Sequence, residues 1–236
     1  MSNRLIVESK NDQIFIQTLV NYLNLLNIRT SSLESISLSK DDYRTLSGLS
    51  FLALEKELET IKADAQKEII NKVGIIVDAD QSISERLDLI NSALKKVFPQ
   101  IKEKLLTITN EFQEVNSDAI GTIQIACHII NVDNLGELEN LLKAIKTEES
   151  IYADCLESWR SCLQEKHKNV SDKEFVKFWV NTYIRFDTCS PKDKKQAEKK
   201  CSMSMNGFEY VMANKKHIWN FEHSALNELK KFLRMF

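Results

Sequence analysis

Two apolar, β-branched stretches that each stop at carboxylates constrain this chain more than any other feature. Residues 5–7 read Leu-Ile-Val and run into Glu8, within "LIVESKND". Residues 73–77 read Val-Gly-Ile-Ile-Val and run into Asp78 and Asp80, within "VGIIVDADQS". Short apolar runs of this kind, bounded by polar residues, predict buried strands. The chain therefore has two strands, far apart in sequence, that both end in acids.

The segments around these strands predict a mostly parallel sheet covered by helices. Helical spacing begins at three places: near Asp12, at "SKDDYRTL", and after Ser82 or Ser84. Pro99 ends the third of these helices. Residues 120–132 alternate like a third strand, and "DNLGELENLLKAI" begins a further helix. The resulting order, strand–helix–helix–strand–helix–strand–helix, is typical of an α/β fold.

The domain organisation follows from the same pattern. We expect an α/β core over residues 1–148 with a helical insertion at about 40–70, and a helical C-terminal portion over residues 149–236. No flexible linker marks a boundary near residue 148, so we favour one compact unit in which the C-terminal portion packs on the core.

Composition excludes some classes of function. The net charge is −2, with 28% charged and 43% hydrophobic residues, so a nucleic-acid partner needs a local basic patch or bound metal ions. There is no apolar window of about 18 residues, so we expect no membrane span. Five cysteines without a CxxC pair indicate reduced thiols in the cytoplasm, and scattered histidines and cysteines do not form a zinc motif.

The acids that end the strands should meet at one edge of the sheet, where ligands of open α/β sheets collect. Glu8, Asp78, Asp80 and Asp133 all follow predicted strands. Two carboxylates about 4 Å apart repel by roughly 4 kcal/mol at an effective dielectric constant near 20. Such a cluster is stable when it is protonated or when it binds a hard cation.

A magnesium or manganese site is the interpretation we favour. Asp78 and Asp80 are two residues apart and point the same way at a strand end, so they can share an ion or hold neighbouring ions. Asp12 can reach back over the strand end from a helix that starts at Asn11. Such ions stabilise the attacking and leaving oxygens of a phosphodiester displacement. The alternative is that each acid is a turn residue or a helix cap.

These motifs resemble those of the TOPRIM domain, in which a glutamate follows the first strand and a D-x-D follows a later one. The stretches that match are "VESKND" and "IIVDAD". The spacing Glu8-x-x-x-Asp12 is similar to that of OLD-family nucleases and of small stand-alone bacterial TOPRIM-like proteins of unknown function. "GELE" within "NVDNLGELENLLKAI" and "IWNFEHSALNELKKFL" also resemble the latter, so the resemblance extends from Leu5 to about Phe232. The usual glycine after the first acid is Ser9 here.

The resemblance implies roles for particular residues. It implies Mg²⁺ or Mn²⁺ as cofactor, with Glu8, Asp12, Asp78 and Asp80 as ligands and Glu137 and Glu139 supplying a further carboxylate for a second ion. It also implies a lysine that stabilises the transition state, for which "SPKDKKQAEKK" offers Lys194 and Lys195. The expected catalytic set is Glu8, Asp78, Asp80, Lys194 and Lys195.

Two functions from different classes are consistent with the sequence. The first is a divalent-metal-dependent nuclease that cleaves DNA or RNA, in DNA processing or phage defence by resemblance. The second is a non-catalytic TOPRIM-like module that binds nucleic acid or a nucleotide and acts with a partner ATPase. The chain lacks a GxxxxGK[ST] loop of its own, and the resemblance implies an ABC-type ATPase partner.

Two surface features bear on partners. The densest basic patch would neutralise nucleic-acid phosphates, or else form a solvated helix face with Asp193 and Glu198; it comprises Lys192, Lys194, Lys195, Lys199 and Lys200. Phe178, Trp179 and the C-terminal phenylalanines are expected in the core, although a subset at the surface could form a homodimer or partner interface.

Overall fold

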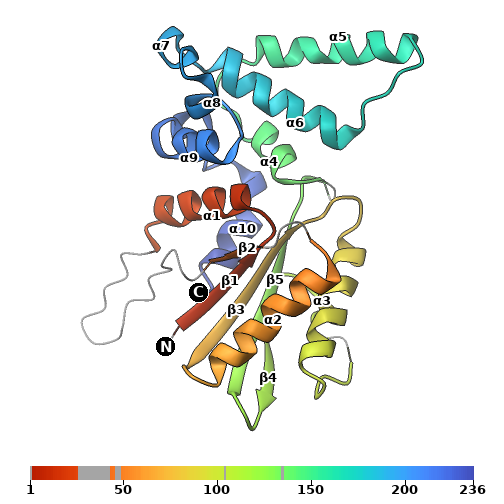
Figure 1. Ribbon diagram of the computed structural model, residues 1–236, viewed down its shortest axis with the longest axis vertical. Coiled ribbons are helices and arrows are strands. Elements are labelled where there is room, and N and C mark those ends of the chain that lie inside the picture. Colours follow the sequence, from red (N-terminus) through yellow and green to blue (C-terminus); the bar gives the residue numbers. More distant parts are fainter. Residues whose placement is uncertain (1, 26–42, 46–48, 104, 134–135) are drawn as a thin grey trace.

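Five strands form one sheet in the part of the chain that the computed structural model describes, which is residues 2–25, 43–45, 49–103, 105–133 and 136–236 (Figure 1). The strand order is β2-β1-β3-β5-β4, with β1 Ser2–Val7, β2 Tyr43–Thr45, β3 Ile70–Asp78, β4 Gln113–Ser117 and β5 Gly121–Ile130. All neighbours pair in parallel except β4, which is antiparallel to β5. The predicted mixed α/β fold with a mostly parallel sheet is confirmed.

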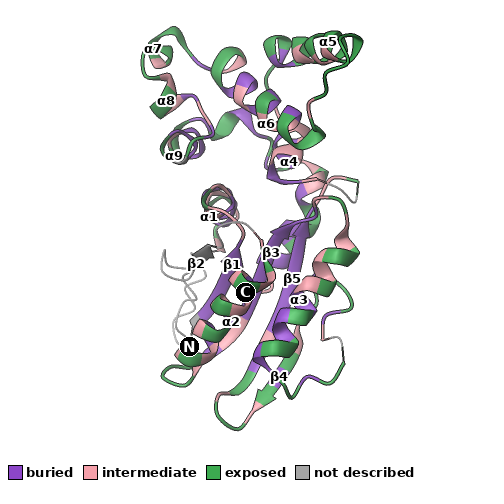
Figure 2. Cartoon of the chain, turned by 45° about the vertical axis from the view of Figure 1, so that its right-hand side comes forward, coloured by how far each residue is buried: buried purple, intermediate pink, exposed green. Residues whose placement is uncertain are grey.

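The strand register brings the acids that end β1 and β3 to one end of the sheet. Val7 of β1 lies beside Ile76 of β3, and Asp78 of β3 lies beside Ile130 of β5. The three strands run in the same direction, so their carboxyl ends meet at the same edge. Figure 2 shows most of β1, β3 and β5 as buried, which agrees with the apolar residues that dominate their carboxyl-terminal halves.

Two helices cover one face of the sheet, α2 (Phe51–Ala65) and α3 (Ile83–Val97). Ser82 caps α3 as predicted, because its side chain accepts a hydrogen bond from the backbone N–H of Glu85. Alternate strand residues point into this layer and contact the apolar stripes of both helices; they include Ile6, Ile75, Val77, Ile125 and Ile129.

The other face of the sheet packs against α1 and α10, and the other C-terminal helices lie beyond the carboxyl ends of the strands (Figure 1). The helices are α1 Lys10–Tyr22, α4 Leu138–Ala144, α5 Ile151–Glu165, α6 Asp172–Thr182, α7 Pro191–Lys194, α8 Ala197–Lys200, α9 Met205–Asn214 and α10 Asn227–Leu233, and a π-helical segment, Tyr183–Asp187, follows α6. One continuous hydrophobic cluster joins this face to the C-terminal portion; it includes Leu5, Phe15, Trp179, Phe208 and Phe232.

The structure corrects the helical insertion expected at about 40–70. Residues 43–45 form the edge strand β2, and helix occupies Phe51–Ala65 before β3 begins at Ile70. Residues 39–42 and 46–48, which belong to the expected helix start, lie outside the described residues. Strand β2 supplies partners for the N–H and C=O groups on the outer edge of β1, an interaction that helical spacing does not reveal.

The expectation of five reduced thiols is wrong for one pair. Cys189 and Cys201 form a disulfide, with their Cα atoms 6.0 Å apart. Helices α7 and α8 lie between them and turn the chain back on itself. Cys127 is a buried free thiol, and Cys155 and Cys162 are exposed free thiols. A search of the described residues found no helix with both the length and the apolar character needed to span a membrane.

Candidate functional site

Glu8 links the carboxyl ends of β1 and β3. Its Oε2 accepts a hydrogen bond of 3.2 Å from the backbone N–H of Asp78, and its Oε1 accepts one of 3.3 Å from Leu49. The carboxylate of the first strand therefore lies against the backbone where the second strand ends. The parallel register of β1 and β3 produces this contact between residues that are 70 positions apart.

Asp12 is held over the same edge by the start of α1. Its Oδ2 accepts a 2.7 Å hydrogen bond from the Ser9 N–H, while Ser9 Oγ accepts from the Asp12 N–H in a reciprocal capping box. Only 3% of the Asp12 surface is exposed. Burial raises the pKa of the Asp12 carboxyl to about 6, and repulsion by Glu8 and Glu139 adds to the effect, against the opposing hydrogen bonds from Ser9.

Asp78 lies at the centre of the cluster. Its Oδ1 accepts a 3.1 Å hydrogen bond from the backbone N–H of Leu138. Burial raises the pKa of Asp78 well above its usual value, and the negative charges of its neighbours raise it further; these are Asp12, Glu8, Glu139 and Glu137. Burial also raises the pKa of Glu139, partly offset by the nearby Lys177. The structure thus brings five carboxylates into electrostatic contact: Glu8, Asp12, Asp78, Glu137 and Glu139.

Asp80 occupies a strained position beside this group. Its φ is +47°, and its backbone pairs with that of Gly136 through hydrogen bonds of 3.0 and 2.9 Å. The Asp80 carboxylate forms an ion pair with Arg86 of α3 and a second one, of 3.2 Å, with Lys173 of α6. Backbone strain of this kind tends to accumulate at functional sites.

Two lysines of α6 that the sequence analysis missed reach the site. Lys173 and Lys177 are four residues apart and lie on one helical face. Their Nζ atoms lie 2.9 and 3.2 Å from the two carboxylate oxygens of the buried Glu137, at the start of α4. Burial lowers the pKa of Lys173, but its hydrogen bond and attraction to Glu137 outweigh burial and raise it overall. The i, i+4 spacing was visible in the sequence, whereas the docking of α6 over the strand ends was not.

A cleft opens above these residues, with a volume of about 840 Å³. Its walls come from the end of β3, the start of α3, the start of α4 and the start of α6. Charged groups of both signs face it, among them Asp80, Arg86, Glu137 and Lys173. Glu137 is the member of the five clustered carboxylates that lines the cleft, and the cationic side chains of Arg86 and Lys173 lie beside it.

Other residues from the sequence analysis lie elsewhere. Asp133 is exposed and lines a different cavity, together with His128 and His223. Lys194 ends α7 and Lys195 follows it, and the Nζ of Lys194 lies 5.7 Å from the centre of the Phe186 ring. In Figure 1, α7 lies at the end of the helical portion that is remote from the sheet. The expected catalytic lysines are therefore not near the carboxylates in this structure.

The donor atoms of the cluster fit a hard divalent cation, although they are not arranged around one. Every side chain contributes carboxylate oxygen, the ligand that Mg²⁺ and Mn²⁺ prefer. No ion pair within the described residues involves Asp12 or Asp78, so a bound cation would compensate the negative charge of both side chains. Across those same residues, no three histidine, cysteine or acidic side chains are already placed to hold an ion. Binding therefore requires rotation of the carboxylates.

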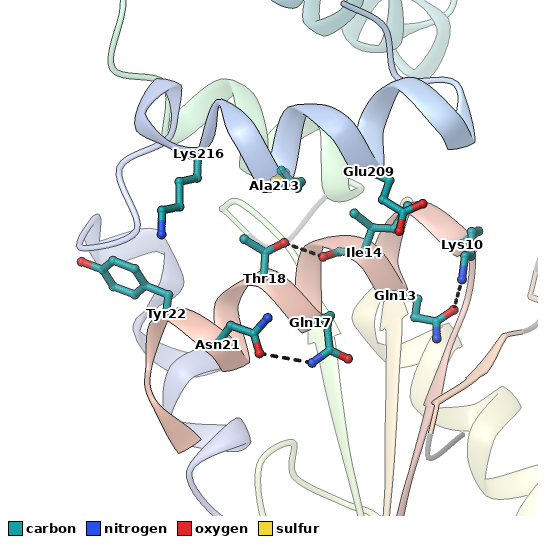
Figure 3. Close-up of a pocket in the computed structure, with 11 residues that line it drawn as sticks. Lys10, Gln13, Ile14, Gln17, Thr18, Asn21, Tyr22, Glu209, Ala213 and Lys216 are labelled. Carbon is teal, nitrogen blue, oxygen red and sulfur yellow. Dashed lines mark hydrogen bonds between the residues drawn. The ribbon is translucent and has the colours of Figure 1, made fainter. Parts of the chain in front are cut away.

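A second cavity, of about 420 Å³, lies between α1 and α9 (Figure 3). Amide and hydroxyl side chains of α1 dominate its wall, with Lys10 hydrogen-bonded to Gln13 and Gln17 to Asn21. None of the five clustered carboxylates lines it. The cleft above the strand ends is therefore the better candidate for chemistry.

The comparisons with known proteins identify a family. A model described as "Protein of unknown function (DUF3226)" matches residues 2–236. The chain belongs to this family. No curated protein matches the chain, and no solved structure matches it. The geometry and charge of the site are therefore what indicate the function of this DUF3226 member.

The raised pKa of Asp12 predicts a dependence of stability on pH in the absence of divalent metal. Its folded pKa of about 6 exceeds the reference value of 3.8, so folding favours the protonated form. The stabilisation is complete below the reference value and is lost as the pH rises through about 6. As the pH rises from about 5 to about 7.5, ionisation of Asp12 alone should lower the free energy of unfolding by roughly 1–2 kcal/mol.

Urea unfolding in EDTA at the two pH values measures this cost. Asp12→Asn keeps an oxygen acceptor for the Ser9 N–H but cannot ionise, so it should lose less stability than the wild type as the pH rises. Equal losses in the two proteins would contradict the assignment of the pKa shift to Asp12.

Proposed function

We propose that this protein is a divalent-metal-dependent nuclease that cleaves phosphodiester bonds of DNA or RNA. The observation that carries the proposal is the group of buried carboxylates at the strand ends, in which Asp78 feels the charges of Asp12, Glu8, Glu139 and Glu137. Burying charges of one sign is unfavourable unless a counter-ion compensates them. The resemblance of "VESKND" and "IIVDAD" to TOPRIM motifs supports the same interpretation.

In this proposal the carboxylates divide into two groups. Glu8, Asp12 and Asp78 would hold a first Mg²⁺ or Mn²⁺, and Asp80, Glu137 and Glu139 would contribute to a second. The bound ions would supply charge stabilisation on the phosphoryl oxygens and activation of the attacking water. Glu8 is oriented for its role by the Asp78 and Leu49 N–H groups, and Asp12 by that of Ser9.

Lys173 and Lys177 are better placed than Lys194 and Lys195 to stabilise the transition state. Their ammonium groups now neutralise Asp80 and Glu137. Once cations compensate those carboxylates, the lysines would become free to bind the charged phosphate. Their attraction to the phosphate would strengthen as negative charge develops on it in the transition state. Arg86 lies on the opposite wall of the cleft and can act in the same way.

The same ion pairs favour a second candidate function. Arg86, Lys173 and Lys177 already compensate two of the carboxylates without metal, which suits a module that binds nucleic acid or a nucleotide and does not cut it. Such a module would act with a partner ATPase, as the TOPRIM-like resemblance suggests. A role in DNA processing or phage defence is compatible with both functions, and turnover distinguishes them.

The nuclease proposal predicts that Asp78→Asn/Asp80→Asn abolishes cleavage. The amides preserve side-chain shape but remove two negative charges, so metal-dependent turnover should fall at least about 10²-fold. Supercoiled plasmid, single-stranded DNA and transfer RNA with Mg²⁺ or Mn²⁺ are suitable substrates. Asp133→Asn is the matched control, because Asp133 also follows a strand but lies outside the cluster. Full activity of the double variant would contradict the proposal.

A second prediction separates the two pairs of lysines. Lys173→Met should lower kcat by about 10²–10³-fold, because the ammonium group acts on charge that develops in the transition state. Lys194→Met should raise KM and leave kcat nearly unchanged. Lys67→Met, in the exposed turn that follows α2, controls for loss of a surface charge. A larger fall in kcat for Lys194→Met than for Lys173→Met would restore the α7 lysines as the catalytic candidates.

A further inference from the structure

Two pairs of aromatic side chains are exposed on the outer helices of the C-terminal portion. Tyr152 is 58% exposed and Phe186 45%, with ring centres 5.9 Å apart. Trp159 is 40% exposed and Phe178 47%, with ring centres 5.5 Å apart. The expectation that Phe178 is a core residue is therefore wrong, whereas the adjacent Trp179 is fully buried. We call these four residues the aromatic track.

The track follows the length of α5. Tyr152 and Trp159 are seven residues apart, which places them on one helical face and about 10.5 Å apart along the axis. Helix α5 has 15 residues but buries only Ala153, and Figure 2 shows most of it as exposed. The rings of Tyr152 and Trp159 therefore contact the neighbouring rings of Phe186 and Phe178, in a tilted and an edge-to-face pair, and all four rings stay partly open to solvent.

Cations surround one end of the track. The guanidinium of Arg185 and the Nζ of Lys194 each lie 5.7 Å from the centre of the Phe186 ring. Helices α7 and α8 present further exposed lysines beside it, and the Cys189–Cys201 disulfide closes this segment. Exposed aromatic rings with cations against their faces are characteristic of surfaces that bind unpaired bases and their phosphates.

The lysines are largely available for a ligand. Asp193, the acid within α7, lies 3.9 Å from Lys200 and 3.6 Å from Lys215. These two cations compensate it. Other lysines of this segment have no ion pair among the residues that the structure describes; they are Lys192, Lys195 and Lys199. The segment therefore carries uncompensated positive charge next to the aromatic rings, although the whole chain has a net charge of −2.

We propose that the aromatic track binds single-stranded nucleic acid, with bases stacked on its rings and phosphates on Arg185 and the lysines of α7 and α8. A duplex cannot use these rings, because its bases are already stacked and paired. The charge next to Phe186 favours a polyanion over an apolar protein surface. The inference rests on the proposed function and names its substrate class as single-stranded.

The track is continuous with the candidate site through α6. Phe178 directly follows Lys177, whose Nζ lies 3.2 Å from Glu137 in the acid cluster. The first turn of α6 lines the cleft, where Ser171, Asp172 and Lys173 lie. Helix α6 therefore carries Phe178 of the track as well as Lys173 and Lys177 of the candidate site.

The test measures binding without turnover. Fluorescence anisotropy in EDTA compares a labelled oligothymidylate, long enough for a site of about 4–16 nucleotides, with a duplex of the same length. The wild type should bind the single strand more tightly than the duplex. Tyr152→Ser/Trp159→Ser should weaken single-strand binding by about tenfold or more, whereas Tyr152→Phe/Trp159→Phe should retain affinity because the rings remain. Leu52→Ser, on the exposed face of α2, is the control for removing a surface apolar side chain.

Salt dependence gives an independent readout. Lys192→Gln/Lys195→Gln/Lys199→Gln should reduce the slope of log affinity against log salt by up to about two, because up to three phosphate contacts with a single strand are lost. Unchanged single-strand binding in the serine variant would overturn the proposal, as would equal affinity for the duplex. The wild type could instead sediment as a dimer that the serine substitutions dissociate, and bind no single strand. That result would overturn the proposal and assign the track to contact between two copies of the chain.

The outcomes for the track and for the nuclease are separable. If the serine variant binds and cuts single strands as the wild type does, the proposal for the track is refuted and the nuclease proposal is not. Track-dependent binding without any metal-dependent cleavage would leave the track in place and refute the nuclease proposal.

Discussion

The parallel pairing of β1 with β3 is the constraint on which the site depends. It places Val7 beside Ile76, so that Glu8 reaches the backbone N–H of Asp78 at the point where both strands end. The capping box at Ser9 then directs Asp12 to the same place. Leu5 and Val7 pack on one face of the sheet and Ile6 on the other, so a shift of one residue would exchange these side chains between the two layers.

The electrostatic consequence is an asymmetric cluster. Asp80 and Glu137 at its outer side have cationic partners from α3 and α6. Asp12 and Asp78 on the inner side lie among other acids, and burial raises the pKa of both. Packing of the core thus offsets the repulsion between these carboxylates. Binding of a hard cation or a proton would reduce that repulsion. In the proposed nuclease, this coupling would link the stability of the fold to occupancy of the site.

The sequence was most informative where a single physical effect dominated. Continuous apolar runs predicted β1 and β3, alternation predicted β5, and a serine cap with helical spacing predicted α3. The acids that follow β1 and β3 were sufficient to predict that Glu8, Asp12 and Asp78 meet. Strand β2 was missed because only three residues form it, and its stability comes from the edge of β1 rather than from its own composition.

Other features that sequence reasoning missed depend on tertiary packing of the C-terminal helices. The i, i+4 spacing of Lys173 and Lys177 is common on solvated helices, and only the docking of α6 over α4 makes it part of the site. The basic run around Lys194 was more conspicuous, but it lies on a different element. Cys189 and Cys201 meet because α7 and α8 turn the chain back, and Phe178 is exposed because Trp179 takes the inward-facing position of α6.

Calorimetric titration of Mn²⁺ into the purified protein at about pH 6 tests the central claim most directly. Repeating it in two buffers of different ionisation enthalpy counts the protons that binding releases. If buried carboxylates with raised pKa values hold the ion, binding should be measurable, release a substantial fraction of a proton per ion, and disappear in Asp78→Asn. Absence of Mn²⁺ binding at millimolar concentration, or binding that Asp78→Asn leaves intact, would contradict the account.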